Sequence, residues 1–120
     1  MATSTHTLKE RLGRYREITI RVIGRKTGRR ISIPVWFVVE GDELHLLPVS
    51  GSKSQWYKNV RENPSIGIDA RGVEAEFRAV PVTGAKAVKA VVDKFREKYG
   101  AGDVKKYYSG FDVAVLVKLG

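Results

Sequence analysis

Six short segments typical of β-strands run through this 120-residue chain, and hairpin turns separate most of them. They are residues 15–23, 31–39, 44–49, 65–70, 73–82 and 111–119. In the first, Ile18, Ile20 and Val22 alternate with polar residues, which is the pattern of a strand with one buried face. Six strands joined mostly by hairpins, with helices at intervals, predict an α+β fold built on a small, mostly antiparallel β-barrel.

Two of the hairpins are indicated directly by their turns. Glycine-containing turns occupy Glu40–Glu43 and Arg71–Gly72, and each is flanked by two of the strand-like segments. We expect Val73, Ala75 and Phe77 to face inward, because they alternate with charged residues.

Helical spacing of apolar residues appears in segments 8–13, 54–62 and 85–99, so two or three helices are expected to flank the barrel. Asn63-Pro64 and Gly100 supply stops, and Ser52 or Ser54 is the expected N-cap of the middle helix. No repeat, linker or second domain is visible, so residues 1–120 are predicted to form a single domain.

Composition excludes several kinds of site. The chain has no cysteine, which excludes disulfide scaffolds, zinc ribbons and thiolate nucleophiles. Its only imidazoles are those of His6 and His45, so we predict no metal site. No apolar run reaches the roughly 18–20 residues of a membrane span, and the first residues lack the apolar core of a signal peptide. A cytoplasmic protein without a membrane span is expected.

The charge balance points to an anionic partner. Lysine and arginine number 22 against 13 acidic residues, which gives a net charge of +9. Such a chain favours nucleic acid, a membrane surface, or a small molecule that carries phosphates or carboxylates. Charge alone does not choose among these three.

A basic turn, Gly24-Arg25-Lys26-Thr27-Gly28-Arg29-Arg30, separates the first two strand-like segments. The glycines that flank Thr27 permit positive φ, so the turn could bring backbone N–H and guanidinium groups against an anion. The alternative is a solvated hairpin loop. The strand that follows carries Trp36 and Phe37, which must face opposite sides because they are adjacent.

A second candidate anion site lies where the loop Ser50-Gly51-Ser52-Lys53 leads into the helix that begins with Trp56-Tyr57-Lys58-Asn59. Free N–H groups and the positive end of a helix dipole are expected there. The alternative is that Trp56 only anchors the core. No Ser/His/Asp arrangement, paired carboxylates or P-loop is present, so hydrolytic chemistry is disfavoured.

Three motifs together resemble the deazaflavin-dependent nitroreductase family. They are Gly24–Gly28, Pro34 with the aromatic strand after it, and Trp56-Tyr57-Lys58-Asn59-Val60 with Asn63-Pro64. The resemblance extends over residues 18–82 and more loosely over the last helix and strand. It implies the split β-barrel of the FMN-binding and pyridoxamine-phosphate-oxidase type, with six strands.

The resemblance also implies an activity and a set of site residues. A reduced deazaflavin, coenzyme F420, would pass hydride to a quinone, a nitro compound or a similar electrophile, while the protein binds and orients it. No catalytic residue is assigned, and the candidates on the substrate side are Tyr99, Tyr107 and Tyr108. The implied cofactor-binding residues are Arg25, Lys26, Thr27, Pro34, Val35, Trp36, Ser50, Gly51, Lys53, Trp56 and Asn59.

Two alternatives remain open. The same site could hold FMN, with its phosphate on the basic turn. In another class, a nucleic-acid-binding barrel would use basic side chains along one face and Trp36, Tyr57 or Tyr108 as stacking platforms. Its basic residues would be Arg25, Lys26, Arg29, Arg30, Lys53 and Arg61. We also predict a homodimer, because adjacent Trp36 and Phe37 and the apolar strand faces exceed what one small barrel covers.

Overall fold

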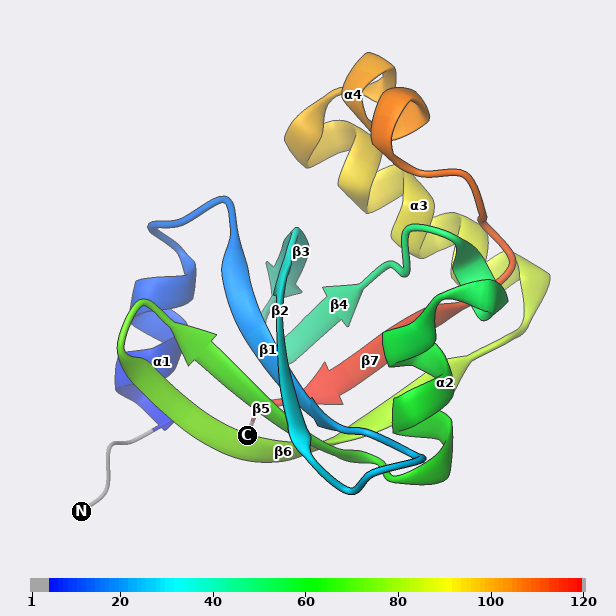
Figure 1. Cartoon of the computed structure of the whole chain (residues 1–120). Helices are drawn as coiled ribbons and strands as arrows, with labels where there is room; N and C mark the ends of the chain where they lie inside the picture. The colour runs from blue at the N-terminus through cyan, green and yellow to red at the C-terminus, as the bar shows by residue number, and fades with distance from the viewer. Residues whose placement is uncertain (1–4, 120) are drawn as a thin grey trace.

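A curled antiparallel sheet forms the centre of the computed structural model, which describes residues 5–119 (Figure 1). The described residues form seven strands: β1 (Ile18–Ile23), β2 (Arg30–Val35), β3 (Phe37–Glu40), β4 (Glu43–Leu46), β5 (Ser65–Ala70), β6 (Val73–Val82) and β7 (Ala114–Lys118). They also form a 3-10 helix, η1 (Gly51–Lys53), and the α-helices α1 (Thr5–Leu12), α2 (Gln55–Glu62), α3 (Ala85–Tyr99) and α4 (Ala101–Tyr107). The predicted α+β class and antiparallel sheet are confirmed.

The strand order makes the sheet a half-barrel. Its strands run β2-β1-β5-β6-β7-β4-β3, and every neighbouring pair is antiparallel. The two outermost strands, β2 and β3, follow each other in the chain and are separated only by Trp36. The sheet must therefore curl until its two edges approach each other at this residue.

The predicted strand at 31–39 is wrong in one respect, because the chain breaks it in two at Trp36 and thereby gives seven strands instead of six. β2 pairs with β1, where Val35 lies opposite Ile18, whereas β3 pairs with β4, where Phe37 lies opposite Leu46. The residues on both sides of the break favour strands, so their propensities do not explain the corner. It arises because β2 pairs with β1 and β3 pairs with β4. Pro34 is accommodated in β2 because this strand lies at the edge of the sheet.

The hairpin predictions are confirmed. β5 and β6 have the predicted bounds and are joined by Arg71 and Gly72, with φ angles of 58° and 106°. β3 and β4 are joined through Gly41, whose φ is 62°. Positive φ angles of this kind are those that two-residue hairpin loops require.

The helix predictions hold for three segments and miss a fourth. α3 has the predicted bounds and stops at Gly100, whose φ is 94°, while α2 begins one residue later than predicted. α4 was not predicted, because its seven residues include Gly102 and carry little helical pattern. Packing on α3 stabilises it instead, since Val104 is completely buried there.

The buried residues form two clusters on the two faces of the sheet. The first joins the inner strand residues to α1 and α2, with Leu8, Ile20 and Tyr57 among its members. The second packs α3 and α4 against the sheet through residues such as Phe95 and Ala114. In Figure 1 these two helices stand together at the end of the sheet where β4 ends.

Candidate functional site

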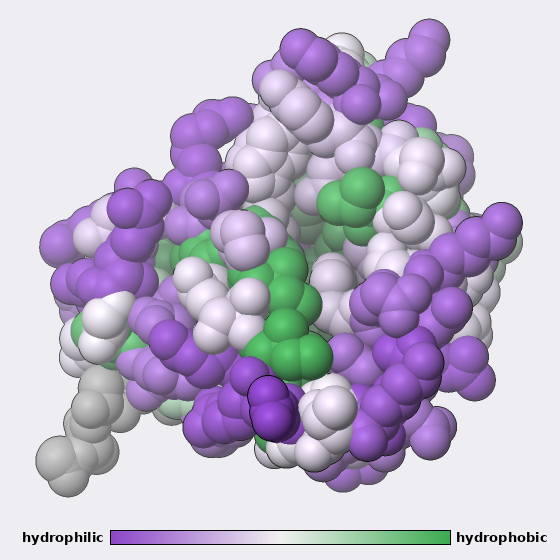
Figure 2. Space-filling model, viewed as in Figure 1, coloured by the Kyte–Doolittle hydropathy of each residue, from purple (hydrophilic) through white to green (hydrophobic). Residues whose placement is uncertain are grey.

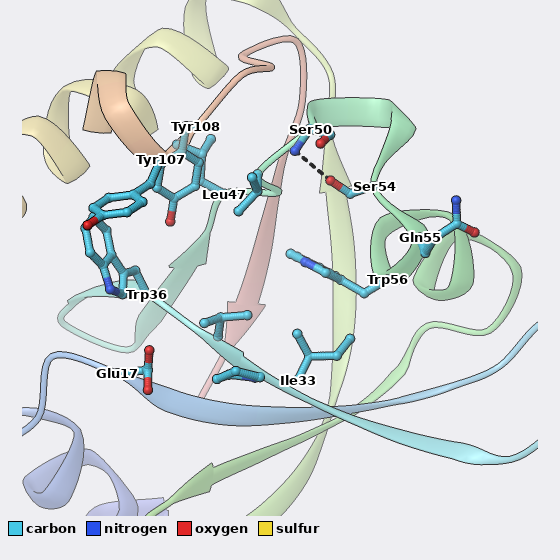
Figure 3. Close-up of a pocket in the computed structure, with 13 residues that line it drawn as sticks. Glu17, Ile33, Trp36, Leu47, Ser50, Ser54, Gln55, Trp56, Tyr107 and Tyr108 are labelled. Atoms are coloured by element: carbon cyan, nitrogen blue, oxygen red, sulfur yellow. Dashed lines mark hydrogen bonds between the residues drawn. The ribbon is translucent and has the colours of Figure 1, made fainter. Parts of the chain in front are cut away.

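A cavity of about 630 Å³ opens between the edge strand β2, the start of α2 and the end of α4. Figure 2 shows the apolar surface that lies in the hollow of this face. The residues that line the cavity are Glu17, Ile33, Pro34, Val35, Trp36, Leu47, Val49, Ser50, Ser54, Gln55, Trp56, Tyr107 and Tyr108 (Figure 3).

The β2 strand forms one side of the cavity with Ile33, Pro34 and Val35. Because β2 is an edge strand, no further strand covers it on this side. Its unpaired edge therefore offers backbone groups to a ligand. Ile33 and Val35 remain only half-buried, so an apolar ligand surface would gain contact area by binding over them.

Aromatic side chains stand on two opposite sides of the cavity. In Figure 3, Trp36 and Tyr107 lie together on one side, and Trp56 reaches in from α2 on the other. The rings of Trp36 and Tyr107 meet edge to face, with centroids 5.5 Å apart, and Tyr108 lies 6.0 Å from Trp36. This arrangement suits a flat, largely apolar ligand.

Tyr99 supports Trp36 from behind and does not line the cavity. Its hydroxyl accepts a hydrogen bond from the Phe37 N–H at 3.0 Å and lies 2.7 Å from the Arg16 carbonyl oxygen and 2.8 Å from that of Phe37. Burial raises the pKa of Tyr99 to about 12, so the hydroxyl keeps its proton and stays available as a donor. Burial also raises the pKa of Tyr108.

The three substrate-side candidates therefore differ. Tyr107 and Tyr108 line the cavity. Tyr99 instead lies behind Trp36 and hydrogen-bonds the backbone at the corner between β2 and β3. Tyr107 is 53% exposed and lies at the rim, while Tyr108 is 6% exposed.

The start of α2 presents unpaired backbone donors to the cavity. Ser54 occupies the N-cap position, but its hydroxyl accepts a hydrogen bond from the Ser50 N–H at 2.8 Å and does not cap the helix. The first backbone bond of the helix runs from Lys58 to the Ser54 carbonyl at 3.1 Å. Among the described residues, the N–H groups of Gln55, Trp56 and Tyr57 have no acceptor. Ser54, Gln55 and Trp56 line the cavity, so the positive end of the helix dipole lies beside it.

The loop before α2 is tied to the loop before β7. The hydroxyl and N–H of Ser52 donate to the Asp112 carboxylate at 2.5 and 3.0 Å, and these bonds lower the pKa of Asp112. Gly110 comes so close that a Cβ on it would lie 2.6 Å from the Gly51 nitrogen. Gly51 and Lys53 thus shape the loop from outside the cavity lining.

Arg25 lies behind the cavity wall. Its guanidinium donates to the Asn59 side-chain oxygen and to the Gln55 side-chain oxygen, both at 2.8 Å. Its backbone N–H also donates to Asn59 at 3.1 Å. These hydrogen bonds hold the basic turn against α2. Arg25 does not line the cavity, but it contacts Gln55, which does.

The basic turn does not form the expected cradle of backbone N–H groups. Only Gly28 of the glycine pair has a positive φ, at 74°, and its N–H donates to the Gly24 carbonyl at 2.8 Å. The Arg29 N–H donates to the Thr27 hydroxyl at 3.2 Å. The N–H groups of Gly24, Gly28 and Arg29 are thus used within the turn and do not face an anion.

The four cations of this turn have different surroundings. Arg30 pairs with Glu74 and Glu76, at 3.3 and 2.7 Å. Lys26 and Arg29 are exposed, and within residues 5–119 no carboxylate pairs with either. Lys26 and Arg29 are therefore cations of this turn that no described carboxylate neutralises.

Of the eleven cofactor-binding residues implied by the resemblance, five line the cavity: Pro34, Val35, Trp36, Ser50 and Trp56. Arg25 and Asn59 lie behind it, while Lys26, Thr27, Gly51 and Lys53 lie outside the lining. Sequence reasoning did not assign six of the lining residues to the site: Glu17, Ile33, Leu47, Val49, Ser54 and Gln55. The period-two spacing of Ile33 and Val35 could have identified Ile33; nothing local marks Glu17.

In the part of the chain that the structure describes, no group of three acidic or histidine side chains could hold a metal ion. His45 lies in β4, buried and outside the cavity, and its Nε2 has no hydrogen-bond partner. Burial lowers its pKa, so the imidazole is neutral at pH 7. No helix within residues 5–119 has the length and apolarity needed to cross a membrane.

A sequence model of one protein family, described as "Uncharacterized protein conserved in bacteria (DUF2255)", matches residues 9–112. No curated protein matches the chain.

Solved structures share the fold at low sequence identity. An F420-H2 dependent reductase, FDR-A, is 17% identical with a TM-score of 0.67 and covers 86% of this chain and 94% of its own. A putative pyridoxamine 5'-phosphate oxidase from Listeria innocua is 12% identical with a TM-score of 0.69, at 94% and 90% coverage. HutZ, the heme storage protein of Vibrio cholerae, is 14% identical with a TM-score of 0.70, at 94% and 87%. These similarities establish the fold, which is that of a pyridoxamine-phosphate-oxidase-like split barrel, and leave the function to the site.

Proposed function

Since this chain belongs to the bacterial family described as DUF2255, we propose its function from its own site: an oxidoreductase that binds a reduced deazaflavin, coenzyme F420, and passes hydride to a quinone, nitro compound or similar electrophile. The observation that carries the proposal is the cavity with aromatic walls on two sides and unpaired helix N–H groups at one end. A flat ring that bears a phosphate needs both features.

The ring would lie against β2, between Trp36 and Trp56. A volume of about 630 Å³ lies within the range of cofactor sites, and the lining is mostly apolar. Trp36 is held in place because Tyr99 stacks behind it and hydrogen-bonds the backbone of Phe37. A fixed wall of this kind lowers the cost of ordering the ligand.

The phosphate would lie near the start of α2. The free N–H groups of Gln55, Trp56 and Tyr57 and the helix dipole favour an anion there. Lys26 and Arg29 add unpaired positive charge on the turn that Arg25 anchors to the same helix. Arg25 is engaged by two neutral amides, so its charge is not cancelled by a carboxylate.

The bound deazaflavin supplies the hydride, and the residues of this chain bind and orient it. Trp36 and Trp56 set the plane of the ring, and the start of α2 sets the position of the phosphate. Glu17 is the one carboxylate among the residues that line the cavity. No acid–base pair is present there, which fits a protein that positions a cofactor and its acceptor.

FMN is the second candidate, because the same site offers a ring pocket and a phosphate site and a neighbour in fold is a putative pyridoxamine 5'-phosphate oxidase. Haem is less favoured, since no histidine is among the residues that line the cavity. Nucleic acid is also less favoured, since two of the three expected stacking platforms, Tyr57 and Tyr108, are only 2% and 6% exposed.

The test is a parallel titration of the purified protein with F420, FMN and haemin, followed by cofactor fluorescence or absorbance and by tryptophan emission. We expect saturable F420 binding that Trp56→Leu weakens and that Tyr15→Leu, outside the cavity, leaves unchanged. Preferential binding of FMN would indicate that the protein uses a flavin and not a deazaflavin. If the protein binds neither F420 nor FMN, the proposal is overturned.

We further propose that the site is completed by a second copy of the chain. Val49 and Tyr107 line the cavity and are 48% and 53% exposed, so apolar surface at its rim is left uncovered. Sedimentation at micromolar concentration should give a dimer mass, and Val49→Asp should shift it toward the monomer. A monomer mass for the natural chain would contradict this.

A further inference from the structure

A second cavity, of about 320 Å³, lies on the other side of β3 from the first and shares no lining residue with it. The segment between α1 and β1 forms one wall, β3 forms another, and α3 contributes Lys98. In Figure 1 the link between α1 and β1 and the strand β3 both lie toward the top of the sheet. The lining residues are Leu12, Gly13, Arg14, Tyr15, Arg16, Phe37, Val38, Val39 and Lys98.

Three of these residues are cations, and none is acidic. The Lys98 ammonium donates to the Phe37 carbonyl oxygen at 2.7 Å and lies 3.7 Å from the centre of the Phe37 ring. The Arg16 guanidinium lies 4.9 Å from the centre of the Tyr99 ring, which Lys98 also approaches, at 5.0 Å. Two positive charges therefore meet at the ring of Tyr99.

These charges have no counter-charge among residues 5–119, where no carboxylate lies within 4.0 Å of Arg14, Arg16 or Lys98. Two cations on the adjoining helices are paired instead. Lys94, one turn earlier on α3, pairs with Glu40, and Lys9 pairs with Asp42. Burial and the nearby Arg16 lower the pKa of Lys98 to about 8, as expected for a cation that lacks a partner.

The remaining walls are apolar. Leu12 and Phe37 are each 1% exposed, and Val38 and Val39 are half-buried. A volume of about 320 Å³ corresponds to roughly ten water-sized units. A ligand that uses the whole cavity therefore has about ten heavy atoms, an apolar body and one anionic end.

We propose that this second cavity binds a small organic carboxylate with an aromatic or branched apolar body. Its carboxylate pairs with Lys98 and Arg16, and its body packs against the half-buried Val38 and Val39. Planar guanidinium and carboxylate groups match in geometry, and the apolar walls disfavour a fully hydrated anion such as inorganic phosphate. This site is separate from the proposed cofactor cavity and does not depend on that assignment.

The test is a titration of the ¹⁵N-labelled full-length protein with benzoate, and separately with inorganic phosphate, followed by amide chemical shifts. We expect saturable benzoate shifts at residues 12–16, 37–39 and 98, with little response to phosphate. Lys98→Met and Arg16→Gln should each weaken benzoate binding about tenfold or more, because each removes a charge-assisted contact. Lys94→Met is the matched control and should bind as the natural chain does.

Several results would overturn the proposal. They are the absence of saturable benzoate binding, shifts centred on Ser50 and Trp56, binding that neither charge-removing variant weakens, and phosphate binding that is as tight as benzoate binding. Arg16 is exposed, so Arg16→Gln keeps the test decisive if Lys98→Met alters the fold.

Discussion

The indole ring of Trp36 lies parallel to the phenol ring of Tyr99, with ring centroids 4.2 Å apart and planes 8° apart. Trp36 occupies the corner between β2 and β3, and Tyr99 is the last residue of α3. One residue of the helix thus supports the side chain that forms a wall of the cavity.

The hydroxyl of Tyr99 should contribute measurably to stability. Tyr99→Phe keeps the stack but leaves the buried Phe37 N–H without this acceptor, so we expect a loss of about 1–3 kcal/mol in the free energy of unfolding. Urea denaturation measures this loss of stability. Tyr107→Phe, at the exposed rim, is the control and should change stability by about 0.5 kcal/mol or less. Equal effects of the two substitutions would contradict the role of Tyr99.

If the basic turn holds a cofactor phosphate, its cations should differ in importance. Lys26→Ala should weaken binding of F420 or FMN by roughly 1–2 kcal/mol, the worth of a charge-assisted contact. Arg30→Ala should leave affinity nearly unchanged, because Arg30 is paired with Glu74 and Glu76. Calorimetric titration compares the two. If Arg30→Ala loses affinity and Lys26→Ala does not, the phosphate does not bind at Lys26.

Lys98 should make stability depend on pH in the alkaline range. Its pKa falls from 10.5 to about 8 on folding, so between these values the unfolded chain holds a proton that the folded chain has released. Raising the pH through this window therefore stabilises the folded state. The free energy of unfolding of the natural chain, minus that of Lys98→Met, should rise from pH 8 to 10.5.

Tyr99 acts in the opposite direction at higher pH. Its pKa rises from 10.0 to about 12 on folding, so stability from this group is lost as the pH increases between these values. Both proteins in the comparison keep Tyr99, so its contribution cancels in the difference. A difference that stays flat from pH 8 to 10.5 would contradict the assignment to Lys98.

Gly110 should be intolerant of even one methyl group. A Cβ there would lie 2.6 Å from the Gly51 nitrogen and from the Ser50 carbonyl carbon, and both are backbone atoms that cannot easily move. We expect Gly110→Ala to cost about 1–3 kcal/mol in thermal or chemical unfolding. Gly102→Ala meets nothing within 4 Å on α4 and should stabilise by up to about 1 kcal/mol. If Gly110→Ala unfolds like the natural chain, the two loops are not in contact.

Local patterns predicted the features that local patterns control. The alternation of Ile18, Ile20 and Val22 identified a half-buried strand, and Arg71-Gly72 identified a hairpin with the bounds observed. Trp36 lies between β-branched and aromatic residues on both sides, so nothing nearby marks the break. The break arises because β2 and β3 pair with different partners, and pairing over such separations leaves no local signal.

The same limit applies to the site. Arg25 and Arg30 look equivalent in a run of cations, yet one contacts Asn59 and the other contacts Glu74 and Glu76, which lie 34 to 46 positions away. The register of β5 with β6 and the placement of α2 decide which charges remain free. The aromatic wall was partly predicted, because Trp36 and Trp56 stand out by residue type alone.

The single-residue corner at Trp36 also determines which genetic changes the site can tolerate. Substitutions along β2 or β3 alter one side chain at a time. A one-residue insertion or deletion between Val35 and Phe37 would instead move one of the strands out of register by one residue, and every side chain of that strand would turn to the opposite face. Evolution can therefore vary the chemistry of this cavity freely but must keep the length of the chain through it constant.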